Sequence, residues 1–423
     1  MELAIRTAMT RLGAGLLQGL LALDTGHRGP RVDCGAGHQA EFVSCRAKAI
    51  DTVVGPVTIS RAWYHCGECG HGVAPGDDRL GVPGSSLSPG LRKMVARAGA
   101  GQPFARAAGL LSELAGVQLT ARRVERSAEA DGAAAAAVTE AGAAAILARR
   151  VVPLPPPRPA DTLYIAVDGT GVPMVPAETA GRAGKYPDGR ARTREVKLAC
   201  LFTQSTLSAE GRPVRDPRSS SYLATFAPAA QFGDLTEAEA RCRGAEHVRQ
   251  LVVLGDGAVW IWNLAGQRFP AATQIVGLYH AREHLYELAS LVAFMLGRDH
   301  PAWLAERLEE LDAGDTPAIA AAARALPLAG RKARELGKAL ACFEANAVRM
   351  RYADFRDLGM FVGSGTVEAG CKAVIGQRLK LSGMRWSVRG ATGIIALRCQ
   401  EASGRWDEIW TRPRNQATVA RPR

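Results

Sequence analysis

The stretch Leu251-Val252-Val253-Leu254-Gly255-Asp256-Gly257 decides the fold class that we expect for this chain. An apolar run bounded by glycine is typical of a strand buried on both faces, in a sheet that helices cover. Alternating apolar positions predict another strand over residues 163–167. Asp256 follows the first of these strands and Asp168 ends the second, so we expect a carboxylate at the end of each.

The surrounding pattern predicts further elements. We expect strands at 195–204 and 222–226, a crossover helix at 236–248, helical periodicity from 281 to about 358, and another helix from 367. A strand-rich region, a helical insertion and a closing helix predict a multidomain protein of the α+β or α/β class.

Composition limits the classes of function. Lys and Arg number 53 against 41 Asp and Glu, a formal net charge of +12, which favours an anionic partner. The chain is 47% hydrophobic and 22% charged, which argues against disorder. Its 423 residues suggest two to three domains at roughly 150 residues each. Nine cysteines, an odd number, fit a reducing cytoplasm better than a disulfide framework.

Residues 1–30 predict an amphipathic helix. Apolar side chains recur at three- and four-residue spacing at Ile5, Met9, Leu12, Leu16, Leu20 and Leu23. The apolar stretch 12–23, about a dozen residues, is too short for a transmembrane span. We therefore expect the helix to pack against another part of the protein.

Cysteine and histidine residues between 34 and 71 predict a zinc site. A Cys-x-x-Cys followed by glycine forms a knuckle from which two thiolates can bind one tetrahedral metal. A strand-like segment, 53–64, precedes it, as in a zinc ribbon. Arg31 stands where a standard first knuckle would have cysteine, so a histidine has to complete the set. The candidate zinc ligands are Cys34, His38, Cys66 and Cys69. A degenerate ribbon held by packing alone is the alternative.

Residues 103–126 predict a helix-turn-helix. Phe104, Ala108, Leu111 and Leu114 share one helical face, a turn follows at 115–117, and Thr120 can cap a second helix. That helix carries the candidate DNA-binding residues Arg122, Arg123 and Arg126, with Val124 facing inward. An ordinary helical hairpin with a solvated basic face fits the same pattern.

Three carboxylates are the candidate catalytic residues. Asp168 and Asp256 lie at strand ends, where ligands gather in sheets covered by helices. Glu368 lies in the first turn of a helix after a Gly-Ser-Gly break. Taken alone, Asp168 could equally belong to an Asp-Gly hairpin turn. Taken alone, Glu368 could simply interact with the dipole of its helix. Together the three could hold two Mg²⁺ or Mn²⁺ ions about 3.5–4 Å apart.

Four motifs resemble the ISKra family of bacterial insertion-sequence transposases. They are VDGTGVPM at 167–174, VLGDGAVWIWN at 253–263, LYHAREHL at 278–285, and the segment 362–386. The resemblance runs from about residue 30 to the C-terminus. It implies a ribonuclease H-like catalytic domain in which a helical insertion precedes the glutamate of an Asp-Asp-Glu triad. That triad falls on Asp168, Asp256 and Glu368. The chain departs from the family pattern at Gly277, where an acidic residue is expected.

Other residues are expected to support this site. The resemblance favours a supporting role for His280 and His284, although core, surface or metal-ligand histidines fit as well. The segment 372–389 predicts a DNA-facing set consisting of Lys372, Arg378, Lys380, Arg385 and Trp386. A solvated helix face with one core tryptophan is the alternative.

The expected function is therefore a DNA transposase. It would bind the terminal repeats of an insertion sequence as double-stranded DNA, cut them with two metals, and transfer the strand to target DNA. Synapsis implies a homodimer or a larger assembly, on the bacterial nucleoid in the cytoplasm and without a membrane. The alternatives are a non-catalytic DNA-binding regulator and a metal-dependent nuclease without strand transfer.

The expected domains follow from these motifs and from the proline-rich segment that begins at residue 151. They are an N-terminal helix at 1–30, a zinc-ribbon-like module at 31–80, a helix-turn-helix-like region at 81–150, a linker at 151–160, the first part of the catalytic core at 161–298, a helical insertion at 299–360, the C-terminal core helices at 361–411 and a basic tail at 412–423.

Overall fold

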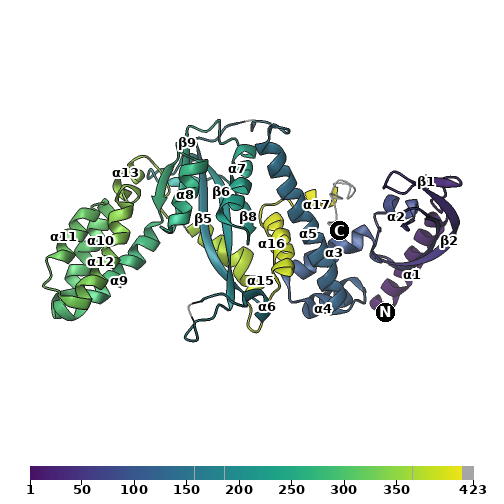
Figure 1. Ribbon diagram of the computed structural model, residues 1–423, viewed down its shortest axis with the longest axis horizontal. Coiled ribbons are helices and arrows are strands. Elements are labelled where there is room, and N and C mark those ends of the chain that lie inside the picture. The colour runs from purple at the N-terminus through teal and green to yellow at the C-terminus, as the bar shows by residue number, and fades with distance from the viewer. Residues whose placement is uncertain (157, 185, 364, 412–423) are drawn as a thin grey trace. The chain divides into compact units, whose positions relative to one another are not determined.

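The computed structural model describes every residue except Pro157, Lys185, Ser364 and 412–423, so the expected basic tail lies outside the described residues (Figure 1). The fold is mixed α and β, and the chain forms two compact units. Unit 1 comprises Met1–Ala135 together with the segment from Trp406, and unit 2 comprises Ala136–Arg405. The division falls inside a helix and not at the proline-rich segment 151–160, which belongs to unit 2.

Unit 1 contains a four-stranded antiparallel sheet in the order β1-β2-β3-β4. Its strands are β1 Arg31–Asp33, β2 Gln39–Thr52, β3 Gly55–His65 and β4 Gly72–Val73. A two-residue turn joins β2 to β3, and Gly55 at its end has a φ of +105°, a conformation that side chains disfavour. Two further loops, between β1 and β2 and between β3 and β4, lie at the other end of this hairpin.

Helix α1, Glu2–Ala22, lies along β3. Ala14, Leu17 and Leu21 pack against the buried side chains of Ile50, Val57 and Ile59. The sequence predicted that a different apolar stripe of α1 would pack inward. That stripe is exposed, because the face with Ala14, Leu17 and Leu21 packs on the sheet instead. The members of the exposed stripe are Ile5, Met9, Leu12, Leu16, Leu20 and Leu23, and each is more than half exposed.

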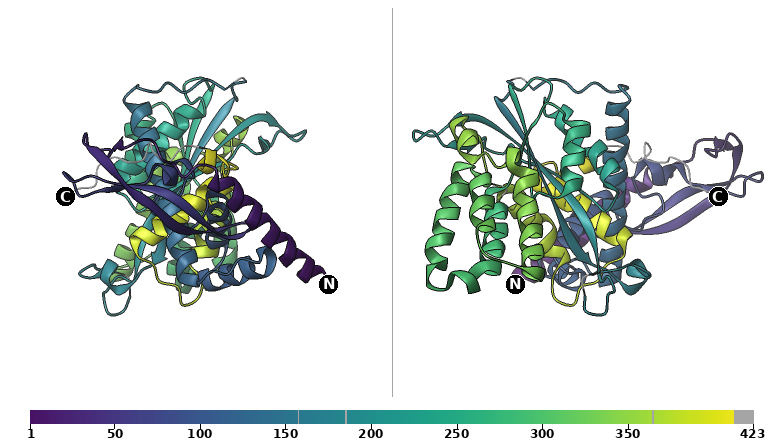
Figure 2. Two further views of the ribbon diagram at one scale, coloured as in Figure 1. Left: turned by 90° about the vertical axis from the view of Figure 1, so that its right-hand side faces the viewer. Right: turned by 60° about the vertical axis from the view of Figure 1, so that its left-hand side comes forward.

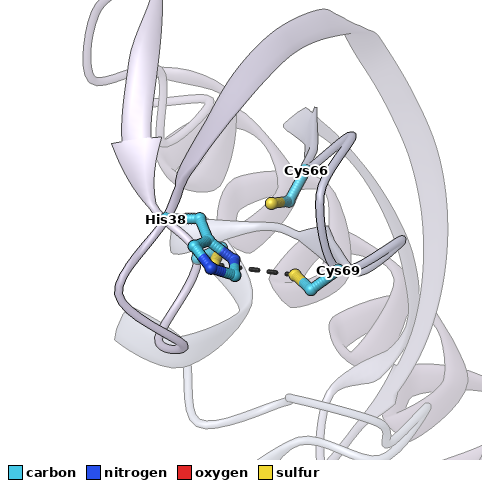
Figure 3. A group of neighbouring side chains, drawn as sticks. His38, Cys66 and Cys69 are labelled. Atoms are coloured by element: carbon cyan, nitrogen blue, oxygen red, sulfur yellow. Dashed lines mark hydrogen bonds between the residues drawn. The ribbon is translucent and has the colours of Figure 1, made fainter.

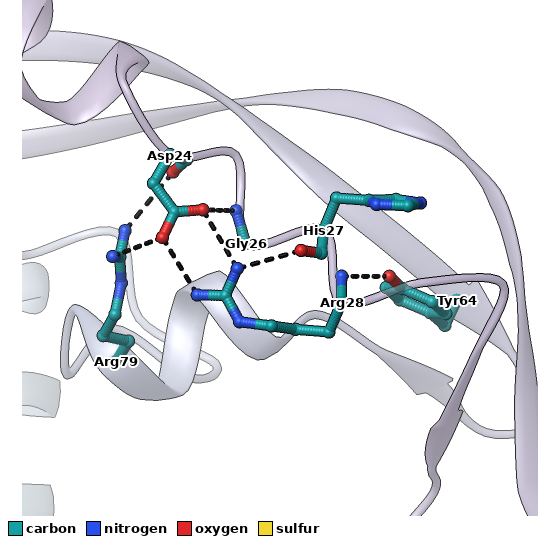
Figure 4. Close-up of polar contacts among 6 residues, drawn as sticks. All are labelled: Asp24, Gly26, His27, Arg28, Tyr64 and Arg79. Carbon is teal, nitrogen blue, oxygen red and sulfur yellow. Dashed lines mark hydrogen bonds and ion pairs between the residues drawn. The ribbon is translucent and has the colours of Figure 1, made fainter.

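The loop after α1 is fixed by one carboxylate. Asp24 accepts hydrogen bonds from the Gly26 backbone at 2.7 Å and pairs with Arg28 at 2.9 Å and Arg79 at 2.5 Å (Figure 4). The hydrogen bond from Arg28 is the main reason that the pKa of Asp24 lies well below its ordinary value. These contacts connect the end of α1 to the short helix α2, Pro75–Arg79, and so hold α1 on the sheet.

The helical part of unit 1 follows the expected hairpin pattern. Its helices are α3 Pro89–Gly101, α4 Phe104–Ala115 and the first half of α5 Ala121–Leu147, and α17 Glu408–Thr411 joins them from the C-terminal segment. Gly116 ends α4 with a φ of +70°, and the Thr120 hydroxyl accepts from the Arg123 backbone at 3.3 Å. Leu111 and Val124 are buried as expected, but Leu114 is 72% exposed, so its predicted core position is wrong.

Helix α5, the second helix of the predicted helix-turn-helix, is 27 residues long. Within the described residues it is the one helix long and apolar enough to cross a membrane, and 22% of its apolar window is buried. Its hydropathy comes largely from alanine, and Asp131 on it forms a buried ion pair with Arg92. These properties make a membrane span a weak interpretation of α5.

Unit 2 is built on a six-stranded mixed sheet. Its strands are β5 Thr162–Pro173, β6 Thr193–Leu207, β7 Pro213–Arg215, β8 Ser221–Thr225, β9 Gln250–Gly255 and β10 Thr273–Val276. Strands β5, β6 and β8 pair antiparallel in the order β8-β6-β5, and β9 and β10 continue the sheet parallel to β5 in the order β5-β9-β10. β7 pairs with the far end of β6.

Helices cover both faces of this sheet. Lys197 on β6 lies 5.5 Å from the ring of Trp260, whereas its neighbour Leu198 faces Gly370. Because neighbouring strand residues point to opposite faces, these two contacts belong to different layers. One layer contains α7 Ala229–Cys242 and α8 Val259–Arg268; the other contains α14 Gly365–Gly370, the π-helical turn η3 Cys371–Gly376, α15 Gln377–Leu379 and α16 Val388–Ala402.

The helical insertion begins earlier than expected. It comprises α9 Leu278–Leu296, η1 Gly297–Asp299, α10 His300–Ala313, α11 Thr316–Arg324, α12 Gly330–Asn346, η2 Ala347–Arg349 and α13 Tyr352–Asp357. Helix α9 packs on α10 and α12, so the insertion starts directly after β10 and not at residue 299 (Figure 2). A short helix α6, Pro176–Thr179, lies in the loop between β5 and β6. The crossover helix α7 ends at Cys242, ahead of the expected residue 248.

Candidate metal centre and carboxylate site

The four candidate zinc ligands lie together in unit 1. One ligand atom from each of Cys34, His38, Cys66 and Cys69 lies within 4.8 Å of the others. The two loops at the end of the β2–β3 hairpin supply two ligands each, and Figure 3 shows the side chains of His38, Cys66 and Cys69 pointing toward one another. Three thiolates and one imidazole form a ligand set that zinc binds in structural sites. The cluster could therefore bind a metal such as zinc.

The loop backbones form tight turns around the ligands. Cys34 donates its backbone N–H to His38 at 3.0 Å, and Cys66 donates to His71 at 2.9 Å. The Gly70 N–H donates to the Cys66 carbonyl at 2.9 Å, and its φ of +68° suits glycine. Hydrogen bonding from the Cys69 backbone lowers the pKa of the Cys66 thiol to about 7. A lower pKa favours the thiolate form that binds metals.

His38 fits the role of fourth ligand. Its Nδ1 atom is buried and has no hydrogen-bond partner within the described part of the chain. Its Nε2 atom lies 3.5 Å from the Glu68 carboxylate. A carboxylate on the second ring nitrogen is a common partner of metal-ligating histidines. Arg31 takes no part in the cluster, because it pairs with Glu41 on the surface at 2.7 Å.

Asp168 lies in the interior of β5. The strand runs past it to Pro173, and Gly169 and Gly171 pair with β6. Asp168 therefore does not end its strand, and the alternative of an Asp-Gly hairpin turn is wrong. Its carboxylate accepts from the Gly169 backbone at 2.6 Å and from the thiol of Cys371 on η3. It faces the layer that contains α14.

Asp256 lies directly after the next strand, β9, which ends at Gly255. Ala166 pairs with Leu254, and each aspartate lies two residues beyond this pair along the chain. Asp256 accepts from the Ala258 backbone at 2.9 Å, which fixes the turn into α8. Glycine is required on both sides: a Cβ on Gly255 would lie 2.9 Å from Ile261, and Gly257 has a φ of +97°.

The third carboxylate, Glu368, lies in the first turn of α14 and is exposed. Burial is the main cause that raises the pKa of Asp168, and the charges of Asp256 and Glu368 raise it further. The fold therefore brings all three carboxylates into one electrostatic neighbourhood. Among the described residues, the cysteine–histidine cluster is the one group of such side chains close enough together to hold a metal ion, and the three carboxylates do not form a second one.

A lysine lies beside this carboxylate site. Lys380 donates a hydrogen bond to the Thr170 hydroxyl, two residues beyond Asp168 on β5. Its charge also lowers the pKa of Cys371, although burial raises that thiol pKa overall. Lys380 is exposed, so its ammonium group remains accessible to an anion near the carboxylates.

The two candidate histidines lie at the start of α9, after β10. The rings of His280 and His284 are 4.9 Å apart, and each lies near a glutamate on α9, Glu283 at 3.2 Å and Glu287 at 3.4 Å. A hydrogen bond with Cys342 on α12 raises the pKa of His284. The contact with Cys342 connects α9 to α12 within the insertion, and a role of the two histidines at the carboxylate site stays a prediction.

Two of the residues expected to face DNA are buried. Arg378 is 0% exposed and its guanidinium lies 4.9 Å from the ring of Trp386. Trp386 is 5% exposed and donates its indole N–H to the Leu379 carbonyl at 3.1 Å. The prediction that these two residues face DNA is wrong, because both side chains are buried in the core and contact each other. Lys372, Lys380 and Arg385 are exposed.

The expected recognition-helix cations also differ among themselves. Arg122 and Arg126 are exposed on α5, as a DNA-facing role requires. Arg123 instead donates to Asp51 at 2.6 Å and to Ser86 at 3.0 Å. It therefore connects α5 to the end of β2 and is less available to a phosphate.

A basic cleft beside the loop that joins β5 to β6 was not predicted from the sequence. A cavity of about 980 Å³ is lined by the loop between these strands and by residues 383–385. Arg182, Arg190 and Arg385 line it, and no ion pair neutralises them within the described residues. Arg192 lies over the Tyr186 ring at 4.4 Å and pairs with Asp188 at 3.1 Å. The density of arginine in residues 182–194 was the signal that could have revealed this cleft.

Compared with known proteins, the chain matches no family model and no curated sequence. Its function therefore has to be argued from the fold and from the two sites.

Proposed function

We propose that this protein is a DNA transposase that cuts and joins phosphodiester bonds with Asp168, Asp256 and Glu368. One observation carries the proposal: Asp168 lies within the electrostatic reach of both other carboxylates, although the three are separated by long stretches of sequence. A carboxylate whose pKa is raised by burial and by neighbouring charges, as that of Asp168 is, is a candidate for a functional site.

The sheet topology supports a ribonuclease H-like catalytic domain. Three antiparallel strands, β5, β6 and β8, are followed by β9 and β10 parallel to β5, in the order β8-β6-β5-β9-β10. A mixed sheet of this kind fits the ribonuclease H-like domain that the resemblance implies. The helical insertion between β10 and α14 is where the resemblance to ISKra transposases implies one.

The donor set suits Mg²⁺ or Mn²⁺, since both prefer carboxylate oxygens. Bound to the three carboxylates, such ions would supply an activated water and stabilise the charge on the leaving oxygen. Asp168 and Asp256 are held for this task by backbone hydrogen bonds from Gly169 and Ala258. Lys380 supplies a fixed positive charge nearby, which suits a DNA phosphate.

Unit 1 suits the recognition of the element ends. We infer that the cysteine–histidine cluster holds zinc in a ribbon-like module, which fixes the two loops at the end of the long hairpin. Arg122 and Arg126 would then reach DNA phosphates from the start of α5. The net charge of +12 makes such binding strongly dependent on salt concentration.

The test is cleavage of DNA duplexes that contain the sequences flanking the gene, with Mg²⁺ or Mn²⁺, comparing wild type with Asp256→Asn. The matched control is Asp299→Asn, which removes an exposed carboxylate in the insertion. We expect specific nicking by wild type and the control, and at least a thousandfold loss in Asp256→Asn.

Binding measured in EDTA separates the rival functions. Wild type that binds these ends but never cuts them would favour a non-catalytic regulator. Nicking without joined products in a plasmid target would favour a nuclease. Cleavage retained by Asp256→Asn would reject the carboxylate site.

A further inference from the structure

Helix α1 has two apolar faces, and unit 1 uses one of them. Ala14, Leu17 and Leu21 pack on the sheet, and the Gln18 side chain accepts from the Thr58 backbone at 2.9 Å. The Asp24 contacts fix the loop that follows (Figure 4). The orientation of α1 on the sheet is therefore determined by contacts within unit 1.

The other face is an apolar stripe that faces away from the sheet. Its six members, which we call the outer stripe, are Ile5 (56% exposed), Met9 (63%), Leu12 (58%), Leu16 (64%), Leu20 (67%) and Leu23 (83%). From Ile5 to Leu23 the steps are three or four residues, so these side chains form one continuous line along the helix. A contiguous apolar surface of this kind on a folded protein marks an interaction site.

The geometry points to a second copy of this chain as the occupant: we propose that two outer stripes pack together as a two-fold helix pair. Ile5, Met9, Leu12, Leu16 and Leu23 follow the alternating spacing of a coiled-coil seam. Helix α1 has 21 residues, the length of three heptads. A stripe with this periodicity is self-complementary, as a two-fold interface requires.

The flank of the stripe permits a close approach. Ala8, Gly15 and Gly19 are exposed beside it, and a Cβ built on either glycine would meet nothing within 4 Å. Small residues let two helix backbones lie near each other. Arg6, the nearest cation, is turned away from the stripe and donates to the Glu113 carbonyl at 3.2 Å. Arg6 therefore does not have to be desolvated at the seam.

The area is sufficient for a stable pair. Leucine and methionine are slightly smaller than aromatic side chains, so at about 150 Å² each and about two-thirds exposed the stripe offers roughly 600 Å² per copy. Two copies would cover roughly 1,200 Å², at the lower end of the ~1,200–2,000 Å² of specific interfaces. A membrane surface fits less well, since interfacial helices carry a solvated basic face and this helix has its opposite face packed on the sheet.

The experiment is the molar mass of the full chain by light scattering across a hundredfold range of concentration, without DNA. We expect a dimer for wild type and a monomer for Leu12→Glu/Leu16→Glu. Leu154→Glu, a matched change at an 88% exposed leucine, should remain a dimer. Circular dichroism and zinc content should be the same in all three proteins, which would show that the substitutions act on assembly.

A wild-type monomer at every concentration would overturn the proposal, and so would a dimer that survives the double substitution. A wild-type monomer that sediments with vesicles containing anionic lipid would assign the stripe to a membrane surface instead. Because no DNA is present, the result is independent of the proposed transposase activity.

Discussion

Asp168 and Asp256 each lie two residues beyond the last paired position of the parallel strands β5 and β9, at Ala166 and Leu254. Both carboxylates are therefore carried past the same end of this strand pairing. Two negative charges at that position repel each other unless a cation lies near them, and this explains why Asp256 contributes to the raised pKa of Asp168.

Replacing Asp168 with Asn should stabilise the metal-free protein. Burial and two neighbouring carboxylates raise the pKa of Asp168, so the fold disfavours its charged form and loses stability as pH rises through that pKa. Removing the charge of Asp168 removes this destabilisation at pH 7. We expect a melting temperature higher by roughly 2–4 °C in EDTA, measured by calorimetry. Mg²⁺ should raise the melting temperature of wild type and leave that of Asp168→Asn unchanged; equal responses would contradict the metal site.

Removing zinc should unfold the sheet of unit 1. We expect purified wild type to contain about one zinc per chain by atomic emission, and Cys66→Ser to contain almost none, because structural zinc sites couple binding to folding. His38→Cys is the informative partner, since four thiolates also bind zinc tetrahedrally. It should keep the metal, whereas His38→Ala should lose it. Full zinc occupancy in His38→Ala would show that this histidine is not a ligand.

The Asp24 contacts should give unit 1 a defined pH dependence. Hydrogen bonding from Arg28 lowers the folded pKa of Asp24 below its ordinary value of 3.8, so the stabilisation is present above pH 3.8 and is lost as pH falls through the folded pKa. Asp24→Asn should therefore melt below wild type at pH 7, and the two should converge in strong acid. A constant difference between pH 7 and pH 2 would show that the charge is not the cause.

The basic cleft should contribute to DNA affinity without a role in catalysis. Replacing Arg182 and Arg190 with Gln removes two cations that have no acidic partner within the described residues. We expect weaker binding to every DNA sequence. The slope of log affinity against log salt concentration should become shallower by about two, one for each lost phosphate contact. Arg324→Gln/Arg331→Gln, two surface arginines of the insertion that already pair with glutamate, is the control. An unchanged salt dependence in the cleft variant would exclude it from the DNA path.

Local patterns predicted the elements well where neighbours in sequence decide the structure. The alternation at 163–167 and the apolar run at 251–254 lie in β5 and β9, and the glycine and threonine that bound α4 and α5 do so as expected. The zinc ligands also followed from spacing, since each knuckle is local. The Asp-Gly pair misled us about the end of β5, because pairing with β6 carries that strand on to Pro173.

Tertiary packing decided the remaining features. The stripe of α1 and the pair Arg378 and Trp386 have compositions that fit either a core or a surface, and only the fold distinguishes them. The face of α1 that carries Leu17 and Leu21 packs on the sheet. Arg378 on α15 is fully buried in the folded chain. Likewise, the basic cleft depends on residues near 182 and near 385 meeting in space, which no local pattern reports.

The glycines on either side of Asp256 make this site vulnerable to mutation in a particular way. Gly255 has no room for a side chain against Ile261, and Gly257 adopts a backbone conformation that other residues disfavour. Three consecutive residues are thus constrained. Two of them, the glycines, are constrained by packing and backbone conformation and not by a catalytic role. A substitution at either glycine would disturb the backbone that positions Asp256, while a sequence that carries it would still show all three acidic residues.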